Sequence, residues 1–414
     1  MDFQDALEYG YYFDRCIDLV FYNSTMEPIA YLNTPKRGLK PTITIKGVSI
    51  EGEYAIDSYI SIQNMAFDVD IAYVSYIKAR MYYGGLEDAV VKSSLTTKMG
   101  TGHVIMYKVL YADQEKDPPN RCIRFQCVVA AKDYTLVNTS LYISGGSLNY
   151  LKEGEDANSL VVELTNKSNS KTTLKTICNE LIQIYNKGIT ENNTDAQKNI
   201  SELKNNVKIS YLEIDSNLED LTVQLSPGAK TLKEFIRELN STKTESSNGK
   251  FSYSGFKIFI DRGSMRVTTP IPNNWKEIAK SEGYSDYEKY YQDKYENNEV
   301  NVYTVNSSSL KKEKSAEAIP LNFVKSATRS ECVIYVETLF DDRITPGCLC
   351  SLKSNAIMGK RFGSKGSKTK GSRILNYADV VTFRNTGKIE YLFSTTEDCY
   401  MKMQGPVTKA EYIE

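Results

Sequence analysis

The sequence predicts a mainly β protein in which two β-rich regions flank a small α+β insert. Segments of period-two alternation at both ends of the chain, strong turn signals between them and helical periodicity in the middle support this fold class. At 414 residues, the chain exceeds one ordinary domain of about 100–200 residues. We expect an N-terminal β-barrel over residues 1–150, an α+β domain over 151–320 and a C-terminal β-barrel over 321–414.

The N-terminal region reads as short strands. Polar and apolar residues alternate over 42–46 and again over 58–63, with Gly47 and Gly52 expected to form the turn between them. Further strands are expected over residues 72–81, 103–111 and 121–130, separated by glycine pairs and by the Asp-Pro-Pro-Asn segment at 117–120. Short strands at this spacing favour a sandwich or a barrel.

The middle region combines helices with one hairpin. Helical periodicity covers 173–185, and Thr231 with Glu234 forms a capping box ahead of a second apolar face. A hairpin with a turn at Gly263 is expected over 256–267. The remaining expectations are an Asn-rich polar loop at 191–206, a Tyr-faced helix at 285–295 and a charged linker at 306–314.

The C-terminal region returns to strands. We expect them over residues 332–338, 349–353, 380–383 and 388–394. A Gly/Ser/Lys loop interrupts them at 358–373, and no internal repeat of 20–50 residues is visible.

The charge balance argues against duplex DNA as the main partner. Lys and Arg number 51 against 52 Asp and Glu, which gives a formal net charge of −1, whereas DNA-binding domains are strongly basic. The N-terminus is acidic with no apolar segment after it, and no stretch approaches the roughly 20 apolar residues of a membrane span. We expect a soluble chain made in a cytoplasm.

Tyrosine and cysteine usage is informative. Tyrosine occurs 30 times against one Trp and one His, which suits surfaces that are half core and half subunit contact, although an AT-rich genome would produce the same bias. The eight cysteines are scattered in a chain without a signal peptide. We expect them to be reduced and mostly buried.

The residues for common catalytic chemistry are scarce. The single histidine, His103, follows Gly100-Thr-Gly102 at a strand start, where a structural role outweighs a catalytic one. Two carboxylate pairs could serve as acid and base but are more typical of surfaces and turns: Asp68 with Asp70, and Asp341 with Asp342.

Metal and phosphate sites are not expected either. Cys348-Leu-Cys350 is too closely spaced for a zinc knuckle, and Cys122 with Cys127 matches no common zinc motif. The glycines and lysines after Gly359 lack the phosphate-loop spacing. We therefore expect no catalytic residue, no metal and no cofactor.

One local excess of positive charge stands out in the loop at 358–373. A flexible basic segment without acids could contact phosphates or an acidic partner, or it could be a solvated hairpin tip. The candidate contact residues are Lys360, Arg361, Lys365, Lys368, Lys370 and Arg373.

Three stretches, taken in order, resemble the central hub proteins of the baseplate in contractile-tailed bacteriophages and related injection systems. Residues 40–47 with 58–65 resemble the paired opening strands of the first hub barrel. Residues 231–240 with 256–267 resemble the helix-plus-hairpin insert. Residues 337–347, a strand followed by an aspartate–arginine turn and Pro-Gly, resemble the opening of the last barrel.

This resemblance implies a virion protein assembled in the host cytoplasm. It implies a homotrimer whose two tube-like barrels per subunit form a ring that joins the tail tube to the central spike and lines the DNA channel. The implied partners are the tube protein, the spike, other baseplate proteins and, in passing, genomic DNA.

Two other functions remain open. An OB-type protein could bind nucleic acid through the 358–373 loop, and salt-dependent binding of single strands would favour it. A tail-associated enzyme that degrades cell walls would need a convergent carboxylate or metal site, which the sequence does not show.

Overall fold

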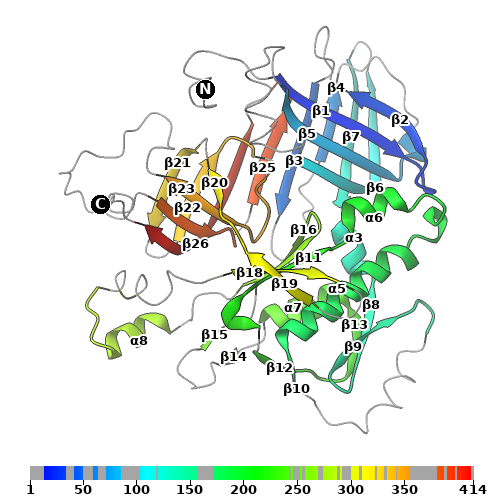
Figure 1. Cartoon of the computed structure of the whole chain (residues 1–414). Helices are drawn as coiled ribbons and strands as arrows, with labels where there is room; N and C mark the ends of the chain where they lie inside the picture. The colour runs from blue at the N-terminus through cyan, green and yellow to red at the C-terminus, as the bar shows by residue number, and fades with distance from the viewer. Residues whose placement is uncertain are drawn as a thin grey trace. The chain divides into compact units, whose positions relative to one another are not determined.

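The computed structural model divides the chain into two compact units (Figure 1). The first combines residues 1–131 with 318–414, and the second comprises 132–317. The structure describes residues 14–33, 42–49, 59–63, 71–84, 103–117, 120–155, 171–219, 221–241, 244–245, 252–253, 257–268, 274–286, 290, 300–306, 310–321, 324–330, 333–341, 343–353, 380–386, 389–396 and 399–411. The division into three domains stays a prediction.

One 14-stranded sheet dominates the described part of the first unit. Its N-terminal half runs in the order β2-β1-β5-β6-β7-β4-β3, and all of its pairs are antiparallel. These strands are β1 (Asp14–Tyr22), β2 (Pro28–Asn33), β3 (Thr42–Ser49), β4 (Tyr59–Gln63), β5 (Tyr76–Gly84), β6 (His103–Asp117) and β7 (Asn120–Ala130), with a 3-10 helix, η1 (Ile71–Tyr73), before β5.

Alternating apolar residues in the middle of β1 and β5 contribute to the core of this half. Ile17 and Leu19 on β1 face Met81 and Ala79 on β5, and all four are fully buried. Successive side chains on a strand point to opposite faces, so every second residue enters the core. Burying each such side chain stabilises the fold by roughly 1.5–3 kcal/mol.

The C-terminal half continues the same sheet. The path runs on from β3 through β25, β26, β24 and β23 to β20, while β22 pairs with both β21 and β26. The long β26 is partnered in turn by β25 at its start, β22 over its first half and β24 near its end. These strands are β20 (Ile319–Leu321), β21 (Val324–Ser330), β22 (Val333–Thr338), β23 (Leu349–Lys353), β24 (Val380–Arg384), β25 (Ile389–Ser394) and β26 (Tyr400–Glu411).

The two halves are joined by the antiparallel β3–β25 ladder, which we call the seam (Figure 1). Ile45 lies opposite Phe393, and the buried hydroxyls of Thr44 and Ser394 are 2.9 Å apart. Phe393 packs edge-on against Phe340 with a centroid separation of 4.8 Å. The first and last segments of the chain therefore share one core.

The described part of the second unit contains four smaller sheets and most of the described helices. Its largest sheet has the order β16-β17-β11-β18-β19, and the others are β13-β8-β9, β10-β12 and β14-β15. The strands are β8 (Ser140–Ser144), β9 (Ser147–Leu151), β10 (Lys171–Thr173), β11 (Tyr211–Asp215), β12 (Thr222–Gln224), β13 (Gly228–Thr231), β14 (Thr244–Glu245), β15 (Ser252–Tyr253), β16 (Lys257–Asp261), β17 (Ser264–Thr268), β18 (Val300–Val305) and β19 (Leu310–Ser315).

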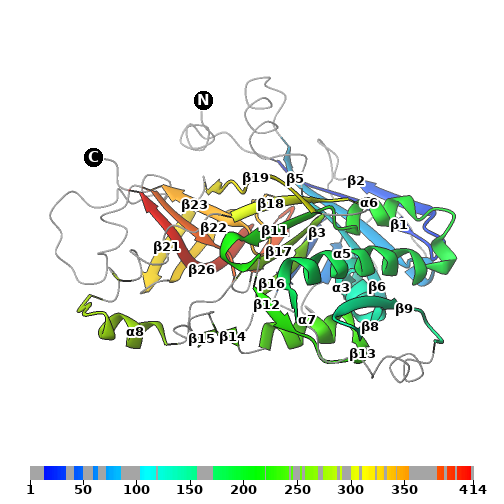
Figure 2. The same cartoon turned by 60° about the horizontal axis from the view of Figure 1, so that its bottom comes forward.

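The helices pack by their apolar faces. The longest, α5 (Leu174–Glu191), buries nine residues at helical spacing and contacts β9 and α6 (Figure 2). The others are α3 (Ala131–Asn138), α6 (Ser201–Val207), α7 (Leu232–Ser241) and α8 (Trp275–Ser281), with 3-10 helices η2 (Thr194–Ala196) and η3 (Ser216–Leu218).

Several local predictions for the second unit are confirmed. The 173–185 helix is α5, and the predicted hairpin is β16–β17. Its two-residue loop holds Arg262 at φ 39° and Gly263 at φ 79°, the left-handed pair that suits a tight hairpin. The predicted capping box precedes α7, because the Thr231 amide donates to Glu234 and the Glu234 amide donates to Thr231 Oγ1.

Other local predictions were wrong. The Asn-rich loop at 191–206 contains most of α6, because Leu203 and Val207 recur at helical spacing and are buried. The expected linker at 306–314 includes most of β19, whose exposed lysines mark a protected sheet edge. Gly47 lies inside β3 instead of a turn. Of the helix expected over 285–295, the described residue Tyr290 is helical and most of the rest lies outside the described part.

The fold class is confirmed at its coarser level, because the chain is mainly β with several sheets and some helices. No closed barrel is present among the residues that the structure describes. Two separate flanking barrels were expected, whereas the described strands of both flanking regions belong to one sheet joined at the seam.

Candidate functional site

The six basic candidates, Lys360, Arg361, Lys365, Lys368, Lys370 and Arg373, all lie outside the described residues. Asp68, Asp70 and Asp342 lie outside them as well. The backbone of His103 begins β6 opposite Met81. The structure therefore describes other candidate sites, built from different residues.

The aspartate–arginine turn after β22 forms a closed ion pair. The Asp341 carboxylate, which is almost fully buried, accepts hydrogen bonds from Arg343 Nε at 2.9 Å and from the Arg343 backbone amide at 3.0 Å. The guanidinium also donates to the carbonyl of Pro320 at 2.9 Å. The ion pair thus fixes the chain between β22 and β23 against β20. Asp341, considered above as half of a carboxylate pair, is therefore bound to Arg343.

The following Pro-Gly turn is anchored by a buried cation. Arg384, only 1% exposed, donates from Nη1 to the carbonyl of Gly347 at 2.6 Å, and the Gly347 amide donates to Asn385 O at 2.7 Å. A Cβ on Gly405 would lie 1.6 Å from the Arg384 carbonyl oxygen, so β26 approaches this point through a glycine. Burial of Arg384 could not be predicted from the sequence, because its partner is a backbone carbonyl 37 residues away.

The Pro-Gly turn leads directly into two neighbouring thiols. Cys348 and Cys350 are buried, and their sulfurs lie 3.5 Å apart. The hydrogen bond between them, followed by burial, raises the pKa of the Cys350 thiol well above its usual value. Five described cysteines are buried, as expected: Cys16, Cys178, Cys348, Cys350 and Cys399. Within the described ranges, no group of three or more His, Cys, Asp and Glu side chains could hold a metal ion.

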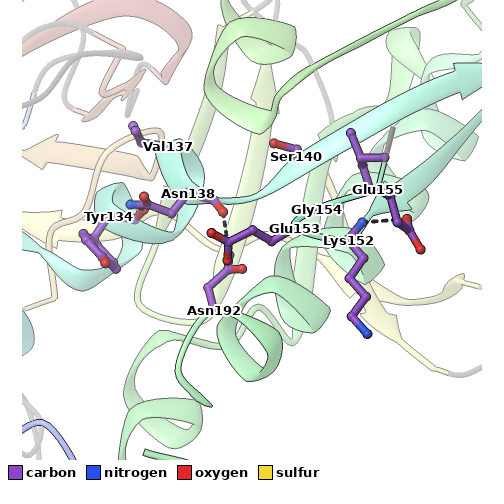
Figure 3. Close-up of a pocket in the computed structure, with 10 residues that line it drawn as sticks. Tyr134, Val137, Asn138, Ser140, Lys152, Glu153, Gly154, Glu155 and Asn192 are labelled. Carbon is purple, nitrogen blue, oxygen red and sulfur yellow. Dashed lines mark hydrogen bonds between the residues drawn. The ribbon is translucent and has the colours of Figure 1, made fainter. Parts of the chain in front are cut away.

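A pocket of about 460 Å³ lies in the second unit, between the end of α3, the turn after β9 and the end of α5 (Figure 3). The Asn192 amide nitrogen donates to the Asn138 carbonyl at 2.7 Å, and the Asn138 amide nitrogen donates to the Tyr134 carbonyl at 2.8 Å. The residues that line it are Tyr134, Val137, Asn138, Ser140, Leu151, Lys152, Glu153, Gly154, Glu155 and Asn192.

The lining of this pocket is mainly polar. The side-chain amide nitrogens of Asn138 and Asn192 donate to backbone carbonyls, and one carboxylate oxygen of Glu155 accepts from the Lys152 amide at 3.0 Å. Glu153 adds a second carboxylate to the lining. The ammonium of Lys152 extends away from Glu153 in Figure 3. The described lining contains neither His nor Cys.

A second carboxylate in this unit lies in a half-buried network. Glu219 Oε1 accepts from Asn301 at 2.9 Å and from the Tyr303 hydroxyl, and Glu219 Oε2 lies 3.4 Å from Lys175 Nζ. The same ammonium lies over the Tyr303 ring at 4.2 Å. These contacts connect Lys175 on α5 with Asn301 and Tyr303 on β18 through one side chain, which suits a structural link between the two elements.

Comparisons with known proteins include the following two weak structural similarities. One is to a chain of the Francisella PdpA–VgrG complex in its lidded form, with 8% identity and a TM-score of 0.37, covering 99% of this chain and 56% of that one. The other is to the tail protein from Neisseria meningitidis, with 8% identity and a TM-score of 0.34, covering 95% and 96%. This chain thus spans little more than half of the first structure.

No protein-family model matches the chain. No curated protein matches it by sequence. Among the described residues, no helix is both long and apolar enough to cross a membrane.

Proposed function

We propose that this chain is a non-catalytic structural protein of a contractile tail or a related injection system, acting as the baseplate hub. It would form a homotrimeric ring that joins the tail tube to the central spike and lines the DNA channel. The observation that carries the proposal is the order of strand, aspartate–arginine turn and Pro-Gly over residues 337–347. Asp342 lies outside the described residues, and the described part forms a half-buried Asp341–Arg343 ion pair and an anchored Pro-Gly turn.

The form of the sheet supports an assembly role. In its described part, the sheet of the first unit ends at β2 on one side and at β20 on the other. On β2, Ile29 and Tyr31 are 41% and 63% exposed, and exposed apolar side chains on an edge strand suit contact with another chain. Near-zero net charge and abundant tyrosine suit extensive protein interfaces.

The test is the mass of the purified chain in solution, measured by light scattering after size exclusion over a concentration series. A trimer, or a monomer that trimerises as concentration rises, is expected, because obligate oligomers are held together by mass action. A chain that is monomeric throughout and binds single-stranded DNA in a salt-dependent manner would contradict the hub and favour the nucleic-acid-binding alternative.

The basic loop is proposed to face the DNA channel or an acidic neighbour. Replacing its six Lys and Arg residues by Ala should reduce tail assembly or DNA passage without changing thermal unfolding. The matched control replaces three exposed lysines of β19 by Ala: Lys311, Lys312 and Lys314. Infectivity equal to that of the unmodified chain would remove the loop from the proposal.

A further inference from the structure

The Cys348–Cys350 pair is close enough for covalent chemistry. Residues two apart on an extended chain have Cα atoms about 6.6 Å apart, and their side chains ordinarily project in parallel. Here the two sulfurs have turned toward each other and lie at 3.5 Å. The Cα separation of an extended pair falls inside the range of about 4.4–6.8 Å that disulfides tolerate. Side-chain rotation can therefore close the remaining gap.

Backbone hydrogen bonds on both sides hold the two cysteines in place. The Cys348 amide donates to Thr345 O at 3.2 Å, and the Cys348 carbonyl accepts from Asn385 N at 2.9 Å. Cys350 lies opposite Phe383 in the β23–β24 ladder. Since the backbone is fixed on both sides, the thiols stay adjacent.

We propose that Cys348 and Cys350 are a redox modification site, at which a small-molecule disulfide converts the two thiols into a reversible intrachain disulfide. The Cys348 sulfur attacks the glutathione disulfide, forms a mixed disulfide and releases one glutathione thiolate. The Cys350 sulfur then attacks Cys348 and expels the second. Two protein thiols are oxidised, one glutathione disulfide is reduced to two thiols, and the cysteine protons pass to the departing thiolates.

The order of attack follows from exposure. Cys348 is 4% exposed and precedes β23, whereas Cys350 is fully buried inside the strand. The raised pKa of Cys350 keeps its thiol protonated, so oxidation is slow and waits for opening of the turn. A disulfide across so short a loop is strained and hence easily reduced.

The biological setting of this chemistry rests on the proposed function. A tail protein is made in a reducing cytoplasm and acts after release into an oxidising medium, which is where disulfides persist. The new bond would tie Cys348, beside the Pro-Gly turn, to β23 and stiffen the segment that the Asp341–Arg343 pair already holds.

The experiment uses the purified full chain, incubated natively with oxidised glutathione, then alkylated and digested with trypsin. Cleavage after Arg343 and Lys353 releases one peptide, residues 344–353, that carries both cysteines and no other. We expect this peptide to lose about 2 Da and both alkylation sites, and to regain them after treatment with a reductant.

Two controls make the result decisive. Cys178 is a single buried thiol whose pKa burial raises to about 12, so its peptide should stay reduced under the same conditions. Cys348→Ser should abolish the 2 Da loss in residues 344–353. If the native peptide keeps two alkylatable thiols while denatured chain oxidises, the proposal is overturned. This outcome would leave the hub untouched, since the hub is tested by mass.

Discussion

At the scale of single residues, the capping box of α7 shows how two side chains fix a helix end. Thr231 and Glu234 satisfy each other's backbone amides, at 2.8 and 3.2 Å. The backbone hydrogen bond from Thr231, followed by the one from its hydroxyl, lowers the pKa of Glu234. The charged carboxylate is therefore the form that stabilises the helix.

Replacing Thr231 by Ala should lower the free energy of unfolding of the second unit by about 1 kcal/mol. Folding lowers the pKa of Glu234, so its carboxylate stabilises the folded chain at pH values above the ordinary carboxyl pKa. This stabilisation is lost as the pH falls through the pKa that Glu234 has in the folded chain. Fluorescence of the single tryptophan, Trp275, reports this unit in urea unfolding. Arg237→Ala, an exposed change in the same helix, should leave stability within about 0.5 kcal/mol.

Residue-scale features were predictable where they depend on neighbours in sequence. The capping box needs only residues three apart, and the turn at Gly263 needs only a residue that tolerates positive φ. The Arg384–Gly347 contact and the Asn138–Asn192 pocket depend on segments brought together by the fold. No periodicity in the sequence carries that information.

At the scale of elements, the close contact of α5 with the start of β8 depends on one glycine. A Cβ built on Gly188 would lie 2.1 Å from Thr139 Oγ1, and Thr139 is fully buried. Glycine inside a helix ordinarily costs about 1 kcal/mol relative to Ala. At position 188, the close approach of Thr139 makes Gly more favourable than Ala.

Gly188→Ala should therefore destabilise the second unit by about 2 kcal/mol, because the added methyl overpacks the contact. Adding Thr139→Ala removes the two nearest opposing atoms, Oγ1 and Cγ2 at 2.1 and 2.6 Å, and keeps only Cβ at 2.9 Å. The double variant should therefore be more stable than Gly188→Ala alone. Urea unfolding followed by Trp275 fluorescence measures both. Gln183→Ala, on the exposed face of α5, is the control. A double variant no more stable than Gly188→Ala would show that the contact is not the cause.

Element prediction succeeded for long periodic segments and failed for edges. α5 and β23 were expected close to their observed bounds because apolar residues recur at the right period. β19 was mistaken for a linker because an edge strand buries almost nothing. β1 was missed although Ile17, Leu19 and Phe21 alternate, so that signal was present in the sequence.

At the scale of the whole molecule, the seam makes the two ends of the chain interdependent. Beyond the Thr44–Ser394 contact, Thr395 Oγ1 accepts from the Ile43 amide at 3.0 Å, and the hydroxyls of Tyr107 and Tyr391 are 3.1 Å apart. The sequence predicted β-rich regions at both ends. It could not show that the two regions belong to one sheet, because strands that pair across more than 300 residues leave no local pattern in the sequence.

A double-mutant cycle tests the seam. Thr44→Val and Ser394→Ala should each destabilise the first unit by about 1–3 kcal/mol, because each removes the hydrogen bond between these two buried hydroxyls. The double variant should cost less than the sum, with a coupling of at least about 0.5 kcal/mol. Hydrogen exchange of β3 and β25 is the measurement, since Trp275 belongs to the other unit. Thr328→Val, at an exposed position on β21, is the control, and additive losses would contradict the coupling.

The seam also delays the pairing of β3 during synthesis. When β3 leaves the ribosome, its partner β25 is still more than 300 codons away, a delay of roughly 20–70 s at ordinary bacterial elongation rates. Throughout that interval β4 can pair with one edge of β3, while the other edge stays without its partner β25. Chaperones, together with the charged residues around that strand, would keep this edge from pairing with another nascent copy until translation ends.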